Sequence, residues 1–145
     1  QSGIRGAEPT EEDAKLFENV QVPIVVSTSE YNMVKAETLS QDFYNLLRQL
    51  MVLDGMEPLP EADYDAYPIA GFDADIYTRT TINDDYVKHS WYKTDDNGVP
   101  MVGATYIESI VHCLYPQHAN IIWDFFKHYS RDLTTGEIVY DPYVR

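Results

Sequence analysis

Residues 23–29 have the sequence Pro-Ile-Val-Val-Ser-Thr-Ser, an almost continuous run of β-branched side chains that begins at a proline. Branching at Cβ favours strands, and this run lacks the alternation of apolar and polar residues that a surface strand shows. A strand without that alternation is typical of a parallel sheet covered on both faces. We therefore expect an α/β fold in which this strand is buried and parallel to its neighbour.

Helices are predicted on either side of this strand. Thr10, followed by three acidic residues, has the pattern of a helix start. A second helix is expected from the hydroxyl cap Ser40 to Gly55, and a third over residues 117–129. The second carries one apolar stripe at helical spacing, made of Phe43, Leu46, Leu47, Leu50 and Met51.

The middle of the chain contains further strands. Alternation predicts strands over 75–82 and 86–92, with another over 102–107, and a short strand over 137–140 in the tail. Asp95-Asp-Asn-Gly98 has the composition of a reversing turn. Residues 56–72 alternate acids with tyrosines and contain prolines, which indicates an irregular loop packed on the body.

This order of elements predicts an open, mostly parallel sheet flanked by helices. It supplies too few neighbours for the strand at 23–29, so the most hydrophobic strand of the sheet would have an unpaired edge. Either the strands pair in an order that the sequence does not show, or the chain is the C-terminal part of a larger fold. We therefore interpret residues 1–145 as the C-terminal segment of a single larger domain.

Composition excludes several classes of partner. The chain has 24 acidic against 10 basic residues and a formal charge of −14, so we expect neither nucleic acid nor a membrane as a partner. The only cysteine is Cys113, which rules out an internal disulfide within these 145 residues.

Several chemistries lack the residues they need. The four histidines form no H-x-x-x-H pair, no glycine-rich loop links a strand to a helix, and no G-x-S-x-G motif is present. We expect neither a metal nor a cofactor. Cys113 directly follows His112, and neighbours on an extended segment point in opposite directions, so we expect Cys113 to be a small buried residue and no dyad with His112.

Two parts of the chain resemble a known family. Val111-His-Cys-Leu-Tyr-Pro116 is followed by Ala119-Asn-Ile-Ile-Trp-Asp-Phe-Phe126, and residues 23–32 have the sequence Pro-Ile-Val-Val-Ser-Thr-Ser-Glu-Tyr-Asn. These segments resemble the C-terminal portion of α/β-hydrolase esterases, in particular the polyhydroxybutyrate-depolymerase and feruloyl-esterase-like group. The resemblance covers residues 20–35 and 75–132, and it implies the C-terminal part of an α/β-hydrolase fold, incomplete in this chain.

The resemblance also implies roles for individual residues. By position, His112 is the general base of a catalytic triad, in the loop after the last strand. The family's Gly-x-x-Asp pattern has Ser29 in place of the glycine and Asn32 in place of the aspartate. Asparagine can orient a histidine but cannot stabilise an imidazolium as a carboxylate does, so Glu30 is the nearest replacement for the triad acid.

Two further acids, Asp84 and Asp85, are candidates for the same role, because they lie directly before the next predicted strand.

The implied function is carboxylic-ester hydrolysis by serine acyl transfer. The substrate would be a small-molecule ester or an ester linked to a polysaccharide, and the nucleophile serine would belong to a preceding, N-terminal segment of the same enzyme. Two alternatives stay open. One is a non-catalytic module that binds a carbohydrate or an aromatic ligand through rings such as Trp91 and Tyr92. The other is a degenerate hydrolase used as a scaffold, which fits Asn32.

Overall fold

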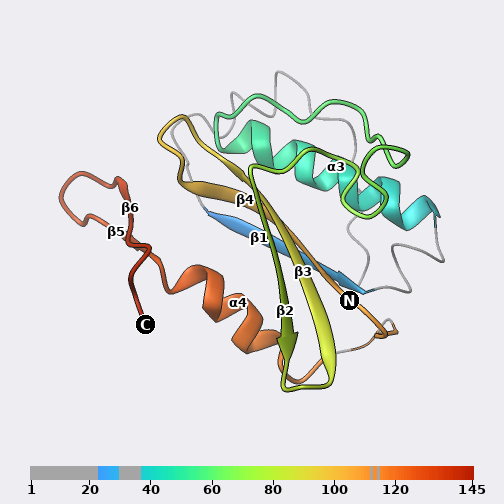
Figure 1. Ribbon diagram of the computed structural model, residues 1–145. Coiled ribbons are helices and arrows are strands. Elements are labelled where there is room, and N and C mark those ends of the chain that lie inside the picture. The colour runs from blue at the N-terminus through green and yellow to red at the C-terminus, as the bar shows by residue number, and fades with distance from the viewer. Residues whose placement is uncertain (1–22, 30–36, 112, 114) are drawn as a thin grey trace.

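The computed structural model describes residues 23–29, 37–111, 113 and 115–145. Figure 1 shows how these residues are arranged as strands and helices. In chain order the elements are β1 (Ile24–Ser29), α3 (Glu37–Leu53), β2 (Ile76–Ile82), β3 (Tyr86–Thr94), β4 (Pro100–Ile107), α4 (His118–Phe126), β5 (Tyr129–Arg131) and β6 (Ile138–Tyr140). The chain is an α/β protein, as its sequence predicts.

The main sheet is mixed. Its strand order is β1-β4-β3-β2, with β1 parallel to β4 and the other two pairs antiparallel. The predicted parallel pairing of the strand at 23–29 is confirmed. Its predicted burial is only partial, because β1 is an edge strand of the described sheet and Ile24, Val25 and Val26 are partly exposed. The prediction of a mostly parallel sheet is wrong for the described residues. The β2–β3 and β3–β4 pairs are antiparallel because short turns connect them, and a short turn can join only antiparallel strands.

Both turns are built by residues that accept unusual backbone angles. Asn83 and Asp84 reverse the chain between β2 and β3 with φ of 51° and 63°, in the left-handed region that asparagine and aspartate tolerate best after glycine. In the predicted turn between β3 and β4, Gly98 has φ of 78°. There the Asp95 carboxylate accepts hydrogen bonds from the backbone N–H groups of Asn97 and Val99, both at 2.9 Å. This turn prediction is confirmed.

Helix α3 packs on one face of the sheet through its predicted apolar stripe. Leu47, Leu50 and Met51 are buried, and Tyr44 beside them is more buried than most of the stripe, at 1% exposure. The helix starts at Glu37, so Ser40 lies inside it and does not cap it. It ends as predicted, since Gly55 adopts the left-handed φ of 69° that follows many helix ends.

The two helices cover opposite faces of the sheet, as Figure 1 shows. Neighbouring residues of a strand point to opposite faces. On β3, Trp91 packs against the core beneath α3, whereas the ring of Tyr92 stacks on Phe125 of α4 with 5.5 Å between centroids. A second apolar cluster, with Ile107 and Ile121, lies on the α4 side.

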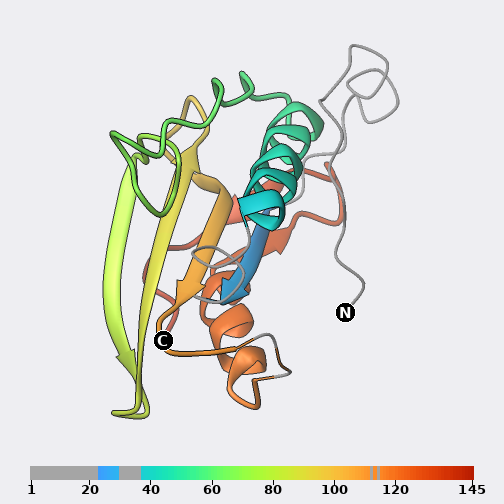
Figure 2. The same cartoon turned by 90° about the vertical axis from the view of Figure 1, so that its right-hand side faces the viewer.

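Residues 56–74 connect α3 to the far edge of the sheet, where β2 lies, and Figure 2 shows this crossing. They contain no helix or strand, as predicted for 56–72, and they are packed on the body. Leu59 and Phe72 are buried in the same core as α3. The Tyr44 hydroxyl donates a hydrogen bond to the carbonyl of Pro60 at 3.0 Å, and burial raises the pKa of Tyr44 to about 12.

The C-terminal region departs from its prediction. Helix α4 ends at Phe126, and Tyr129 begins a two-stranded ribbon in which it pairs with Tyr140. The Tyr129 hydroxyl also donates a hydrogen bond to the carbonyl of Pro100 at the start of β4, and burial raises its pKa. These long-range contacts hold residue 129 in a strand, although its spacing continues the helical pattern. The short strand predicted at 137–140 is confirmed.

Candidate functional site

The three site residues predicted from the sequence, His112, Glu30 and Asn32, lie outside the described residues. The structure does place the strands that precede them. β1 and β4 are parallel neighbours that end in register, with Ser29 opposite Ile107. In the sequence, Glu30 and Asn32 follow β1 and His112 follows β4, so the predicted site residues come after two strands that end side by side. In open α/β sheets, ligands bind outside the carboxyl ends of the strands.

Further residues lie at this same edge. The turn with the alternative acids Asp84 and Asp85 is exposed, and β3 begins beside the end of β4, since Lys88 pairs with Ile107. Tyr115 packs edge-on against Tyr86 with 5.4 Å between ring centroids, which brings the end of the 108–116 connection against the start of β3. Asp84 and Asp85 therefore lie at the same end of the sheet as the carboxyl ends of β1 and β4.

Cys113 is exposed. The expectation that it is buried is wrong, because it lies in an exposed part of the surface, where Val111 is 64% exposed and Pro116 is exposed as well.

A polar line that the sequence analysis missed crosses the α3 face of the sheet. The Tyr77 hydroxyl lies 2.5 Å from Nδ1 of His89, and Nε2 of His89 lies 2.6 Å from the Glu108 carboxylate. His89 is buried, whereas Glu108 at the end of β4 is partly exposed. Three strands contribute to this line, because Tyr77 is on β2, His89 is on β3 and Glu108 directly follows β4.

The proton positions in this line follow from what each group can do. A carboxylate only accepts hydrogen bonds, so Nε2 of His89 carries the proton that Glu108 binds. In neutral His89, Nδ1 is then the acceptor, and the Tyr77 hydroxyl donates to it. The lone pairs of the Tyr77 oxygen can then accept a hydrogen bond from another partner, and the hydrogen bond that the hydroxyl donates makes this oxygen a stronger acceptor.

Tyr77 also lines a groove beside this polar line. The groove has a volume of about 380 Å³ and is lined by Ala66, Tyr67, Pro68, Ile69, Ala70, Phe72, Asp73, Ala74, Tyr77 and Trp91. The rings of Tyr77 and Trp91 lie 5.4 Å apart at 27°, and those of His89 and Trp91 lie 5.7 Å apart at 11°. The 66–74 part of the connection thus faces a row of rings on β2 and β3.

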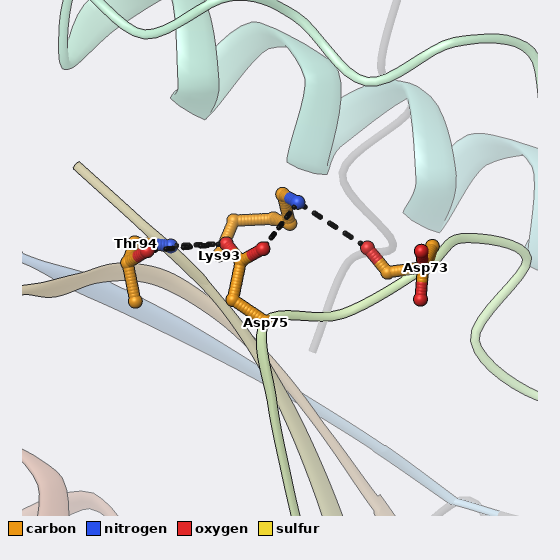
Figure 3. Close-up of polar contacts among 4 residues, drawn as sticks. All are labelled: Asp73, Asp75, Lys93 and Thr94. Atoms are coloured by element: carbon orange, nitrogen blue, oxygen red, sulfur yellow. Dashed lines mark hydrogen bonds and ion pairs between the residues drawn. The ribbon is translucent and has the colours of Figure 1, made fainter. Parts of the chain in front are cut away.

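A polar anchor fixes this part of the connection to β3, as Figure 3 shows. Lys93 donates to the Asp75 carboxylate at 2.8 Å and to the backbone carbonyl of Asp73 at 3.3 Å. The other Asp75 oxygen accepts from the backbone N–H and the hydroxyl of Thr94, at 2.8 and 3.2 Å. Partial burial raises the pKa of Asp75, but the hydrogen bonds from Lys93 and Thr94 outweigh it and leave this pKa below its usual value.

Replacing Asp75 by asparagine is expected to lower the free energy of unfolding at neutral pH by about 1 kcal/mol or less, because solvent screens this partly exposed pair. A carboxylate with a lowered pKa stabilises the fold above its unfolded-state pKa, and this contribution is lost as the pH falls through the folded-state value. Urea unfolding at several pH values measures the difference, which should vanish in acid. Asp73→Asn is the matched control, since Lys93 contacts only the backbone of Asp73, and an equal loss in both variants would contradict the anchor.

The structure separates the two rings proposed for ligand binding. Trp91 lines the groove, whereas Tyr92 lies on the other face, partly buried against Phe125, and burial raises its pKa. The sequence did contain a signal for the groove side. Residues 89 and 91 are two apart on a strand and therefore share a face, and a hairpin brings Tyr77 beside them.

Other kinds of site have no support in the described part of the chain. Residues 23–29, 37–111, 113 and 115–145 contain no group of three or more histidine, cysteine, aspartate or glutamate side chains that could hold a metal ion. Among the helices of these residues, none is both long enough and apolar enough to cross a membrane. The sequence matches no protein-family model and no curated protein.

Proposed function

We propose that this chain supplies the general base, His112, of a serine-dependent carboxylic-ester hydrolase, and that it forms the C-terminal part of an α/β-hydrolase fold. One observation carries the proposal. The segments with His112 and with Glu30 and Asn32 follow two adjacent parallel strands that end together, Ser29 opposite Ile107. A base and its orienting partner on such segments start from the same edge of the sheet, where α/β proteins bind their ligands.

The proposed reaction is acyl transfer in two steps. The serine oxygen attacks the ester carbonyl carbon while His112 takes the serine proton, and the bond to the alcohol then breaks as His112 returns that proton to the leaving oxygen. Water next attacks the acyl carbon while His112 takes a proton from it, and the bond to the serine oxygen then breaks as His112 returns that proton to serine and the carboxylic acid leaves. Stabilising the imidazolium requires a carboxylate, a role that we assign to Glu30, with Asn32 orienting the ring and Asp84 or Asp85 as alternative acids.

The nucleophile is proposed to lie in a preceding segment of the enzyme, because the 145 residues contain no G-x-S-x-G motif. The proposed substrate is a small-molecule ester or an ester linked to a polysaccharide.

Hydrolysis of p-nitrophenyl butyrate by the native protein tests this function. A burst of p-nitrophenol followed by a slower steady rate is expected, since an acyl-enzyme forms before water releases the acid. Absence of any turnover above the buffer rate, in a folded preparation that includes the preceding segment, would contradict the proposal.

A second candidate is a non-catalytic module that binds a carbohydrate or an aromatic ligand. The groove favours it, because Trp91 and Tyr77 line an open volume suited to a small ring. Tyr92 does not contribute, since its ring stacks on Phe125 on the other face of the sheet. This candidate predicts saturable ligand binding by a protein that never hydrolyses an ester.

A further inference from the structure

The groove between residues 66–74 and the strands β2 and β3 is lined mainly by aromatic and small apolar side chains. Four aromatic side chains line it, Tyr67, Phe72, Tyr77 and Trp91. Tyr67 and Tyr77 are 37% and 51% exposed, although large apolar side chains usually gain from burial. Its volume of about 380 Å³ is within the range of small-molecule sites. The groove is therefore suited to a small ligand that covers these exposed rings.

The charges at the groove are of one sign. Asp73 is the one charged residue among its lining residues, and no lysine, arginine or histidine lines it. Lys93, which contacts the backbone carbonyl of Asp73 at 3.3 Å, is already paired with the Asp75 carboxylate at 2.8 Å. With a formal charge of −14 on the whole chain, a positively charged ligand is favoured over an anionic one.

The polar line through His89 adds to this preference. When His89 is neutral and its Nε2–H is bound to Glu108, the Tyr77 hydroxyl donates a hydrogen bond to Nδ1, and the Tyr77 oxygen can still accept one from a ligand. Electron density shifted onto a donating phenol also strengthens the negative face of its ring, and cations bind to such ring faces.

We propose that this groove binds a small organic cation with an alkyl-substituted ammonium group. The rings of Trp91 and Tyr77 contact its alkyl groups and its charge, and Asp73 supplies the opposite charge. This groove does not include the ends of β1 and β4, after which the proposed catalytic residues come in the sequence. The proposal therefore does not depend on ester hydrolysis.

Calorimetric titration of the native protein with choline chloride tests the proposal. The control ligand is 3,3-dimethylbutan-1-ol, which has the shape of choline but carries no charge. Saturable binding of choline is expected, with the neutral alcohol bound about tenfold more weakly, as a desolvated contact between a cation and an aromatic ring would give. Equal affinity for the two ligands, or no saturable binding of choline at millimolar concentrations, would overturn the proposal.

Matched variants locate the site. Trp91→Leu is expected to weaken choline binding by about tenfold, because leucine has no ring face to contact the cation. Trp123→Leu should leave binding unchanged, since Trp123 is 64% exposed on α4 across the sheet. Asp73→Asn at the exposed rim serves as a second probe if Trp91→Leu fails to fold, and it should weaken choline without affecting the alcohol. Unchanged choline affinity in Asp73→Asn and in a folded Trp91→Leu would place the site elsewhere and contradict the assignment.

Discussion

Replacing His112 by alanine is expected to lower kcat for p-nitrophenyl butyrate by about 10⁴-fold or more, because a serine hydroxyl without its base is a poor nucleophile and the leaving alcohol has no acid. Binding of the ester does not need the imidazole, so KM should change much less. Steady-state kinetics measure both constants, and far-ultraviolet circular dichroism checks that the variant is folded.

His128→Ala is the matched histidine control. The His128 side chain is partly buried and its Nδ1 lies 2.8 Å from the carbonyl of Asp141, in the C-terminal ribbon. This substitution should retain turnover. Ester hydrolysis that survives in a folded His112→Ala variant would remove His112 from the mechanism.

Replacing Gly103 by alanine is expected to lower the free energy of unfolding by about 1–3 kcal/mol, because the new methyl group has no room. A Cβ atom at residue 103 would lie 2.4 and 2.5 Å from two ring carbons of Tyr92, which is directly opposite in β3. That ring cannot move away easily, since its other side stacks on Phe125 at an interplanar angle of 3°. Chemical denaturation measures the loss.

A double-mutant cycle shows whether the Tyr92 ring is the cause. In a Tyr92→Ala background the added methyl group meets no ring, so Gly103→Ala should then cost less than about 0.5 kcal/mol. The same loss with and without the ring would show that backbone effects in β4, and not contact with Tyr92, explain the sensitivity of Gly103.

Local patterns were sufficient to predict much of this fold. The β-branched run at 24–29 gives a parallel strand, and the apolar stripe with a terminal Gly55 gives the end of α3. Turn chemistry at residues 95–98 gives the reversal between β3 and β4. In each case the residues that decide the structure are neighbours in the sequence.

The parts that could not be predicted depend on contacts between distant residues. Tyr129 continues a helical pattern, but pairing with Tyr140 and a hydrogen bond to Pro100 hold it in a strand. The line through His89 needs Tyr77 from β2 and Glu108 from directly after β4, and no spacing in the sequence shows that the three meet. Pairing of β1 with β4 is also long-range, and it places the ends of the two strands that precede the predicted site residues side by side.

The rate at which a fluorophosphonate probe labels the native protein and its His112→Ala variant tests the central claim most directly. Intact-mass and peptide analysis then identify the labelled residue. We expect rapid labelling of one serine outside these 145 residues in the native protein, and labelling slowed by orders of magnitude in the folded variant, because we propose that His112 activates that serine. A protein that is folded and includes the preceding segment but takes no label, or that labels equally fast without His112, would contradict the account.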